Sequence, residues 1–143
     1  MVAWFEEKRT MIFPRAVGAI IKRNGKYLLL DRKNIEYGFA SVAGHVDDET
    51  PEEALRREVI EESQLKLLSF KKLFEEDVPW NTCYKHKGHH WIVFECKTEG
   101  TQIPEEDEAK SMGWYSPAEM KTLKLERVWE YFFKKLMILP NND

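Results

Sequence analysis

Apolar and polar residues alternate along the chain in blocks that predict strands, then a helix, then more strands and further helices. The first strong pattern spans residues 16–32, where two apolar runs flank Asn24 and Gly25. Both turn residues tolerate positive φ, so the two runs predict a tight hairpin. Similar apolar patterns predict further strands at residues 38–46, 66–78, 89–98 and 112–116.

Residues 49–65 carry the start signals of a helix. Thr50 is an N-cap, Pro51 occupies the first helical position and Glu53 completes a capping box. Residues 116–123 repeat this start with serine, proline and glutamate. Both segments are therefore expected to be helical.

The C-terminal residues 126–137 predict an amphipathic helix. Its large apolar side chains recur at helical spacing on one face: Val128, Trp129, Phe132, Phe133 and Leu136. The order of strands, helix, strands and helices predicts an α+β fold, with helices covering a mixed sheet. The chain shows no internal repeat and no linker composition, so one domain over residues 1–143 is expected.

Composition and charge narrow the class of protein. The 143 residues are 43% hydrophobic with a net charge of −3, which is typical of a globular protein and disfavours a large nucleic-acid partner. Two cysteines, Cys83 and Cys96, are too few for a disulfide scaffold. The chain has no signal-peptide pattern and no apolar run of about 18 residues. A cytoplasmic protein without a membrane partner is therefore expected.

Residues 47–65 are crowded with carboxylates, some of which fall on an unexpected face. At 100° per residue, measured from Ala54, Glu58, Glu61 and Glu62 lie at about 40°, 340° and 80°. The apolar side chains share this side of the helix: Ala54, Leu55, Val59 and Leu65. The opposite side carries Arg56, Ile60 and Ser63.

Two interpretations of the three glutamates stay open at this point. Like charges three and four residues apart repel, and a divalent cation such as Mg²⁺, which prefers carboxylate oxygens, would relieve that repulsion. Arg57 would pair with Glu61 and orient it. Alternatively, the helix is simply solvated and its glutamates pair with Arg56, Arg57 and nearby lysines.

Residues 43–65, AGHVDDETPEEALRREVIEESQL, resemble the signature of the Nudix hydrolases. Gly44 supplies the glycine of the pattern and Glu49 its first glutamate. The rest matches in register: Arg57, Glu58, Val59, Glu61, Glu62 and Leu65. The resemblance implies a Nudix-type α/β/α sandwich. It also implies that Glu58, Glu61 and Glu62 bind Mg²⁺ or Mn²⁺, while Glu49 and Arg57 hold the glycine loop to the helix.

The sequence departs from the family pattern at three points. Gly44 and Glu49 are separated by four residues, where the family has five. Gln64 stands where the family has a glycine, which removes a favoured left-handed C-cap residue. Ala43 replaces a glycine often found just before the motif. None of these changes touches the three glutamates.

The resemblance implies hydrolysis of a diphosphate linked to another group, often a nucleoside. The expected catalytic set is Glu49, Arg57, Glu58, Glu61 and Glu62, and the expected partner is a small-molecule diphosphate. Glu61 or Glu62 would steer the attacking water. The general base could also come from a later acidic loop that contains Glu105, Glu106 and Glu108. The preferred interpretation of that loop is a solvated turn.

Substrate contacts are predicted at Phe39, Gly44 and Arg15. Phe39 precedes the glycine loop at a position where relatives often carry an aromatic residue, and Arg15 is a candidate phosphate contact. Further candidates are more often core or plain surface residues: Lys22, Arg32, Tyr37, Trp80 and Tyr84.

Four residues have zinc-ligand types: Cys83, His86, His89 and His90. Their spacing does not match a paired zinc motif, so surface histidines, or histidines near the phosphates, are preferred. Two rival functions stay open. One is a Nudix-like module that binds a nucleotide or protein without turnover, and the other is an isomerase of isoprenoid diphosphates, for which no protonating residues are identified. A homodimer is compatible with the sequence.

Overall fold

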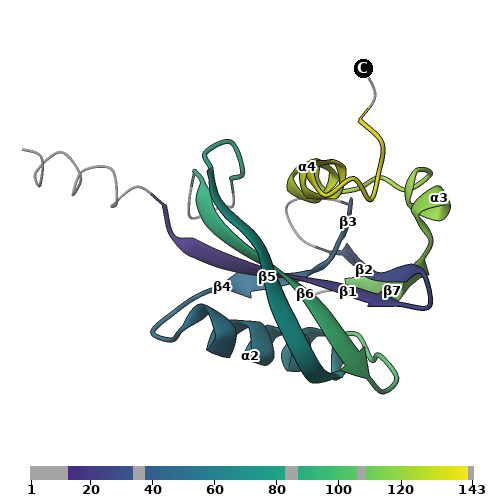
Figure 1. Cartoon of the computed structure of the whole chain (residues 1–143), viewed down its shortest axis with the longest axis horizontal. Coiled ribbons are helices and arrows are strands. Elements are labelled where there is room, and N and C mark those ends of the chain that lie inside the picture. The colour runs from purple at the N-terminus through teal and green to yellow at the C-terminus, as the bar shows by residue number, and fades with distance from the viewer. Residues whose placement is uncertain (1–12, 34–37, 83–86, 106–108, 142–143) are drawn as a thin grey trace, which may run out of the picture.

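The computed structural model describes residues 13–33, 38–82, 87–105 and 109–141. Seven strands and three helices are labelled along these residues in Figure 1. The strands are β1 (Arg15–Arg23), β2 (Lys26–Arg32), β3 (Gly38–Ala40), β4 (Val42–His45), β5 (Lys66–Val78), β6 (His89–Glu99) and β7 (Ala109–Tyr115). The helices are α2 (Pro51–Ser63), α3 (Pro117–Met120) and α4 (Arg127–Lys135).

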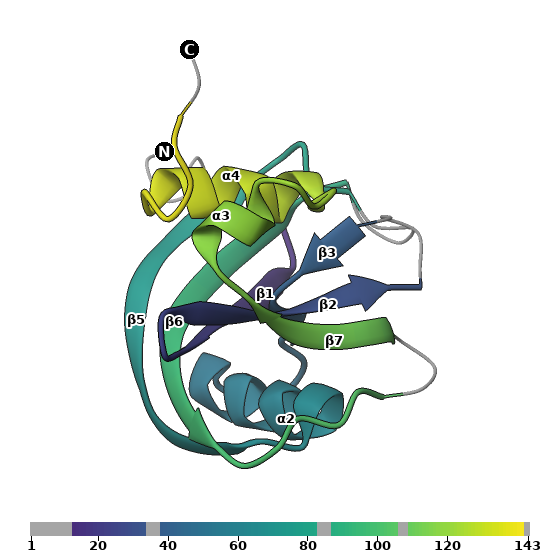
Figure 2. The same ribbon diagram turned by 90° about the vertical axis from the view of Figure 1, so that its right-hand side faces the viewer.

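The strands form one mixed sheet with helices on both faces. The central order is β3-β2-β1-β6-β5, with β4 also paired to β1 and β7 to β2. The β1–β6 pair is parallel and the other pairs are antiparallel. Helix α2 covers one face, while α3 and α4 cover the other (Figures 1 and 2). The expected α+β class and mixed sheet are confirmed.

The hairpin between β1 and β2 forms where Asn24 and Gly25 predict it. Both residues have positive φ, at 53° and 77°. Arg23 pairs with Lys26 across the turn. This is the geometry of a two-residue type I′ turn, which matches the twist of the two strands.

Helix α2 begins as its sequence predicts. The Thr50 hydroxyl accepts the Glu53 N–H at 3.1 Å, and the Thr50 N–H donates to the Glu53 carboxylate at 2.8 Å. The helix ends at Ser63, and Gln64 adopts the left-handed conformation at φ 60°. A glycine is therefore not needed for this C-cap, and the Gln64 N–H still reaches the Ile60 carbonyl at 2.9 Å.

The helical wheel places Ser63 opposite the apolar side of α2, yet Ser63 is 0% exposed in the structure. Its hydroxyl donates to the Val59 carbonyl at 2.6 Å. The Ile103 N–H donates to the Ser63 carbonyl at 2.8 Å, so a distant segment covers the end of the helix. Helical periodicity alone does not anticipate this cover.

Three element boundaries also differ from expectation. Residues 38–46 form two strands, β3 and β4, that meet at Ser41 and pair with different neighbours. Strand β7 begins at Ala109 rather than at Met112, and α3 is only one turn long.

No helix in the described part of the chain is long and apolar enough to span a membrane.

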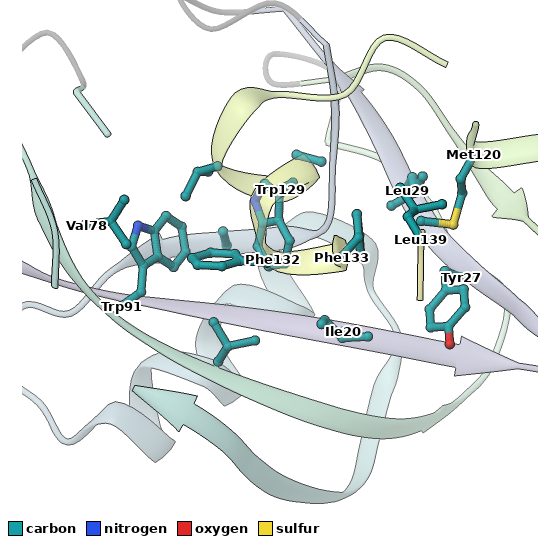
Figure 3. Close-up of a cluster of buried hydrophobic side chains, with 14 of the residues drawn as sticks. Ile20, Tyr27, Leu29, Val78, Trp91, Met120, Trp129, Phe132, Phe133 and Leu139 are labelled. Carbon is teal, nitrogen blue, oxygen red and sulfur yellow. The ribbon is translucent and has the colours of Figure 1, made fainter. Parts of the chain in front are cut away.

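Two apolar cores lie on the two faces of the sheet. The core beneath α4 is aromatic, and Figure 3 shows Trp91, Trp129, Phe132 and Phe133 packed together over β1. The core beneath α2 is mostly aliphatic and includes Val17, Leu28, Leu55, Val59 and Leu65. These cores fix the sheet and hold α2 against β4, where the candidate site lies.

Candidate active site

Arg57 joins the turn before α2 to the helix itself. Its guanidinium donates to both carboxylate oxygens of Glu49, through Nη2 at 2.6 Å and Nε at 3.3 Å. Nη2 also donates to the His45 carbonyl at 2.9 Å. The hydrogen bond from Arg57 lowers the pKa of Glu49. This bidentate pair links Glu49 to α2, although the turn between Gly44 and Glu49 is one residue shorter than in the family pattern.

The same guanidinium reaches two of the expected metal ligands. Nη1 of Arg57 donates to Glu58 at 2.7 Å and to Glu61 at 3.4 Å. Burial raises the pKa of Glu58, although the hydrogen bond from Arg57 opposes that change. A partly buried carboxylate stays ionised more readily when a positive group lies beside it.

Gly44 makes room for the carboxylate of Glu58. A Cβ atom placed on Gly44 would overlap the Oε2 and Cδ atoms of Glu58. No side chain fits there while Glu58 keeps this position. The glycine of the motif is thus required by a close approach between β4 and α2 rather than by a special φ angle.

Glu62 is held on the buried side of the helix. It is 4% exposed, and its Oε1 accepts the Ala43 N–H at 3.3 Å. Glu61 has a side chain that is 53% exposed. The helix therefore presents one buried, one half-buried and one exposed carboxylate beside the end of β4.

The donor set fits a hard divalent cation, since all three side chains offer carboxylate oxygens. Within the described residues, no three His, Cys, Asp or Glu side chains are gathered closely enough to hold a metal ion. Arg57 engages Glu58 and Glu61, while Glu62 is bonded to the backbone of β4. Binding a cation here would require Arg57 to share these carboxylates.

Similarity to known proteins shows the family of this chain. The model of the NUDIX domain matches residues 12–136. The chain belongs to the Nudix family. The Nudix-type hydrolase expected from the sequence is thereby confirmed, while no curated protein matches the chain.

Solved structures show the same Nudix fold. A MutT Nudix hydrolase from Burkholderia pseudomallei is 23% identical, with a TM-score of 0.76 over 86% of this chain and 97% of that one. The Nudix domain of Shewanella oneidensis NrtR, solved with ADP ribose, is 13% identical, with a TM-score of 0.75 over 87% and 86%. The E. coli ORF135 protein is 22% identical, with a TM-score of 0.68 over 94% and 98%. These likenesses confirm the expected sandwich.

Two residues that flank Gly44 take part in the site without having been predicted for it. His45 contributes its carbonyl to Arg57, and Ala43 contributes its N–H to Glu62. Both act through the backbone, which side-chain chemistry does not reveal. Their only signal in the sequence is that they flank Gly44.

Arg15 lies beside the turn between β4 and α2, where its Nη2 donates to the Glu49 carbonyl at 3.3 Å. Phe39 lies farther away. Its ring lies edge-on to the ring of Tyr115, with the two ring centroids 5.6 Å apart. Its N–H donates to the Lys124 carbonyl at 2.8 Å. Arg15 thus lies beside the turn that carries Glu49, whereas Phe39 packs toward the core beneath α4.

The other substrate candidates have protein partners. Arg32 pairs with Glu126 at 3.4 Å, and Lys22 lies 5.7 Å from the ring centre of Tyr27. Trp80 is 38% exposed, with Arg127 lying 4.9 Å from its ring centre. Further candidates lie outside the described residues: Tyr37, Tyr84, Glu106 and Glu108. Glu105 is described and exposed, and its carbonyl accepts the Ala109 N–H at 3.2 Å.

The histidines of the zinc-like group have separate partners. His89 is buried, with its Nε2 at 3.0 Å from Nε2 of His45 and its Nδ1 at 2.9 Å from the Asn81 carbonyl. His90 instead contacts Glu75 at 2.7 Å and Asp77 at 2.8 Å. Cys83 and His86 lie outside the described residues. His89 and His90 thus have different environments, as adjacent strand residues do.

Proposed function

We propose that this Nudix chain is a divalent-metal-dependent pyrophosphohydrolase that cleaves a nucleoside diphosphate linked to another group. The reaction is attack of water on phosphorus. The observation that carries the proposal is the approach of Gly44 to Glu58, because it places a half-buried carboxylate against the backbone of β4. A solvated helix would have no need for this arrangement.

Glu58, Glu61 and Glu62 would hold Mg²⁺ or Mn²⁺. When bound, the cation neutralises phosphate charge and acidifies or orients water. Arg57 acts as a positioning residue, since it fixes Glu58 from one side and Glu49 from the other. Glu61 or Glu62 orients the attacking water and accepts its proton. The water oxygen bonds to phosphorus as the bridging P–O bond breaks.

Arg15 and Gly44 are proposed to lie along the diphosphate, because both contact the turn and helix that carry the glutamates. Phe39 is proposed as a contact for the group attached to the diphosphate. The substrate is a small molecule in this proposal, and the protein acts in the cytoplasm, where a homodimer is also compatible with the function.

The test is hydrolysis of a broad diphosphate panel with and without Mg²⁺. Glu62→Gln removes a charge with little change in shape, and Glu52→Gln is the matched control, because Glu52 is an exposed residue in the first turn of the same helix. We expect metal-dependent cleavage that Glu62→Gln lowers by about a hundredfold or more, whereas Glu52→Gln leaves the rate unchanged.

If the folded protein binds nucleotides but cleaves none of them, it is a binding module instead. The hydrogen bonds from Arg57 to Glu58 and Glu61 make this the second candidate function, because they already engage two of the three carboxylates. Isothermal titration with the same panel distinguishes the two functions.

A further inference from the structure

A cavity of about 490 Å³ lies between α3, α4 and the C-terminal residues that follow them. It is on the face of the sheet opposite α2, and Figure 2 shows α3 and α4 together on that side. Its floor is aliphatic and includes Met120, Leu123, Leu125 and Leu139. Met120 and Leu139 are 0% and 5% exposed, so this floor is part of the fixed core.

The rim of this cavity is basic in a chain whose net charge is −3. Glu130 is the one carboxylate among the described lining residues, and it is already paired with Lys134 at 3.0 Å. Lys121 and Lys124 are exposed, and neither forms an ion pair with any residue that the structure describes. Arg127 also lines the cavity, with its guanidinium over Trp80.

We propose that this cavity is a second ligand site, for a small aliphatic phosphate monoester. Its volume lies within the roughly 300–1,000 Å³ of ligand pockets, and an apolar floor with a few convergent charges is their usual composition. None of the described lining residues is aromatic, so the floor suits an alkyl chain better than a stacked base. Several cations on one rim suit a dianionic phosphate better than a carboxylate.

The site is separate from the carboxylates of α2 but is joined to the sheet. The Phe39 N–H donates to the Lys124 carbonyl at 2.8 Å, and the Glu126 N–H donates to the Phe39 carbonyl at 3.0 Å. The wall of the cavity is thus hydrogen-bonded to β3. A ligand that contacts Lys124 and Leu125 should therefore shift the amide resonances of Phe39 and Glu126, while those of Glu58 and Glu62 stay in place.

The test is titration of the metal-free protein with octyl phosphate, by calorimetry and by ¹⁵N-resolved NMR. We expect saturable binding at one site and the amide shifts described above. The double change Lys121→Gln and Lys124→Gln should weaken binding by about tenfold, since two charge-assisted contacts are lost. The matched control is Lys71→Gln with Lys97→Gln, which removes equal charge from exposed positions on β5 and β6.

Further ligands test the two halves of the chemistry. Inorganic phosphate, octanol and octanoate should each bind more weakly than octyl phosphate, and Leu123→Trp should block binding by filling the cavity. The aliphatic assignment is overturned if adenosine monophosphate displaces octyl phosphate at the amides of the lining residues Lys124 and Leu125 and binds more tightly. The whole proposal fails if octyl phosphate does not saturate, or if its affinity is unchanged by both the lysine pair and Leu123→Trp.

Glu62→Gln should leave this binding unchanged. Because binding is measured without metal and without turnover, its failure is distinguishable from failure of the proposed hydrolysis. Conversely, loss of octyl phosphate binding in Glu62→Gln would place the ligand at the carboxylates and overturn the second site.

Discussion

The two faces of the sheet are filled with different chemistry. Beneath α4, aromatic rings pack edge to face, with Trp129 and Phe132 centred 5.1 Å apart and Trp91 and Phe132 5.3 Å apart. Beneath α2 the core is mostly aliphatic, and α2 itself buries the polar side chains of Glu62 and Ser63. The α4 face is mostly aromatic and buries an amide, Asn81, whose Oδ1 accepts the indole N–H of Trp91 at 2.8 Å. The α2 face carries carboxylates at its edge.

This difference separates stability from chemistry. Burying apolar area contributes about 25 cal/mol per Å², so the aromatic face supplies folding free energy. Burying a carboxylate costs free energy unless hydrogen bonds compensate. The bond from Ala43 to Glu62 and the bond from Arg57 to Glu58 are such compensation. Changes on the α4 face should therefore lower stability, and changes at the α2 edge should mainly lower activity.

The largest expected effect is at Phe132, which is 0% exposed and contacts aromatic rings on several sides. Phe132→Ala should lower the free energy of unfolding by about 3–5 kcal/mol, because it removes a buried ring and leaves a cavity. Urea denaturation followed by tryptophan fluorescence measures this change.

The neighbouring Tyr131 provides the control. It lies at the exposed surface, and its hydroxyl donates to Glu76. Tyr131→Phe keeps the ring and should cost about 1 kcal/mol at most. Equal losses in the two variants would contradict the assignment of stability to the aromatic face.

The second prediction compares two glycines on opposite faces. Gly44→Ala would push the Glu58 carboxylate out of place, so hydrolysis should fall by about a hundredfold with a modest change in stability. Gly18→Ala places a Cβ 2.6 Å from the Trp129 ring, which should cost about 1–3 kcal/mol of stability by overpacking.

Steady-state rates and melting temperatures of the two variants form a crossed test. The expected pattern is loss of kcat for Gly44→Ala and loss of Tm for Gly18→Ala, which should keep its kcat below its melting point. If Gly44→Ala retained full kcat, the position of Glu58 against β4 would not matter for the chemistry.

The sequence predicts features that local interactions decide. Asn24 and Gly25 specify their turn, and Thr50 with Glu53 specifies the start of α2. The motif also leads to the prediction, still to be tested, that Glu58, Glu61 and Glu62 bind the metal. The contacts that it does not reveal join segments distant in sequence: the hydrogen bond from Ile103 to Ser63, and the backbone N–H of Ala43 that reaches Glu62. Such contacts follow from tertiary packing, so neither propensity nor periodicity contains them.

The third prediction sharpens the α2 edge itself. Arg57→Lys keeps a positive charge but loses the fork that bonds both oxygens of Glu49 while reaching Glu58. We expect the Mg²⁺ concentration for half-maximal activity to rise by about tenfold, as for other residues that orient ligands. Arg56→Lys is the control, because Arg56 is exposed and stacks over Phe70 at 5.2 Å. If Arg57→Lys needs no more Mg²⁺ than the unchanged protein, Arg57 does not position the metal ligands.

The smallest expected effect is on stability at His90, a residue outside both cores, and it depends on the charge of the imidazole. Burial favours its neutral form, but hydrogen bonds to Glu75 and Asp77 outweigh this and raise the pKa of His90 above 6.5. Its folded pKa thus exceeds its unfolded one, so its stabilising contribution is complete below about pH 6.5 and is lost as pH rises through the folded value. His90→Gln should therefore lower the free energy of unfolding, measured by urea denaturation, by less than about 1 kcal/mol at about pH 5.5 and leave it nearly unchanged at about pH 9. A gap that is constant with pH would mean that His90 acts through packing and not through its charge.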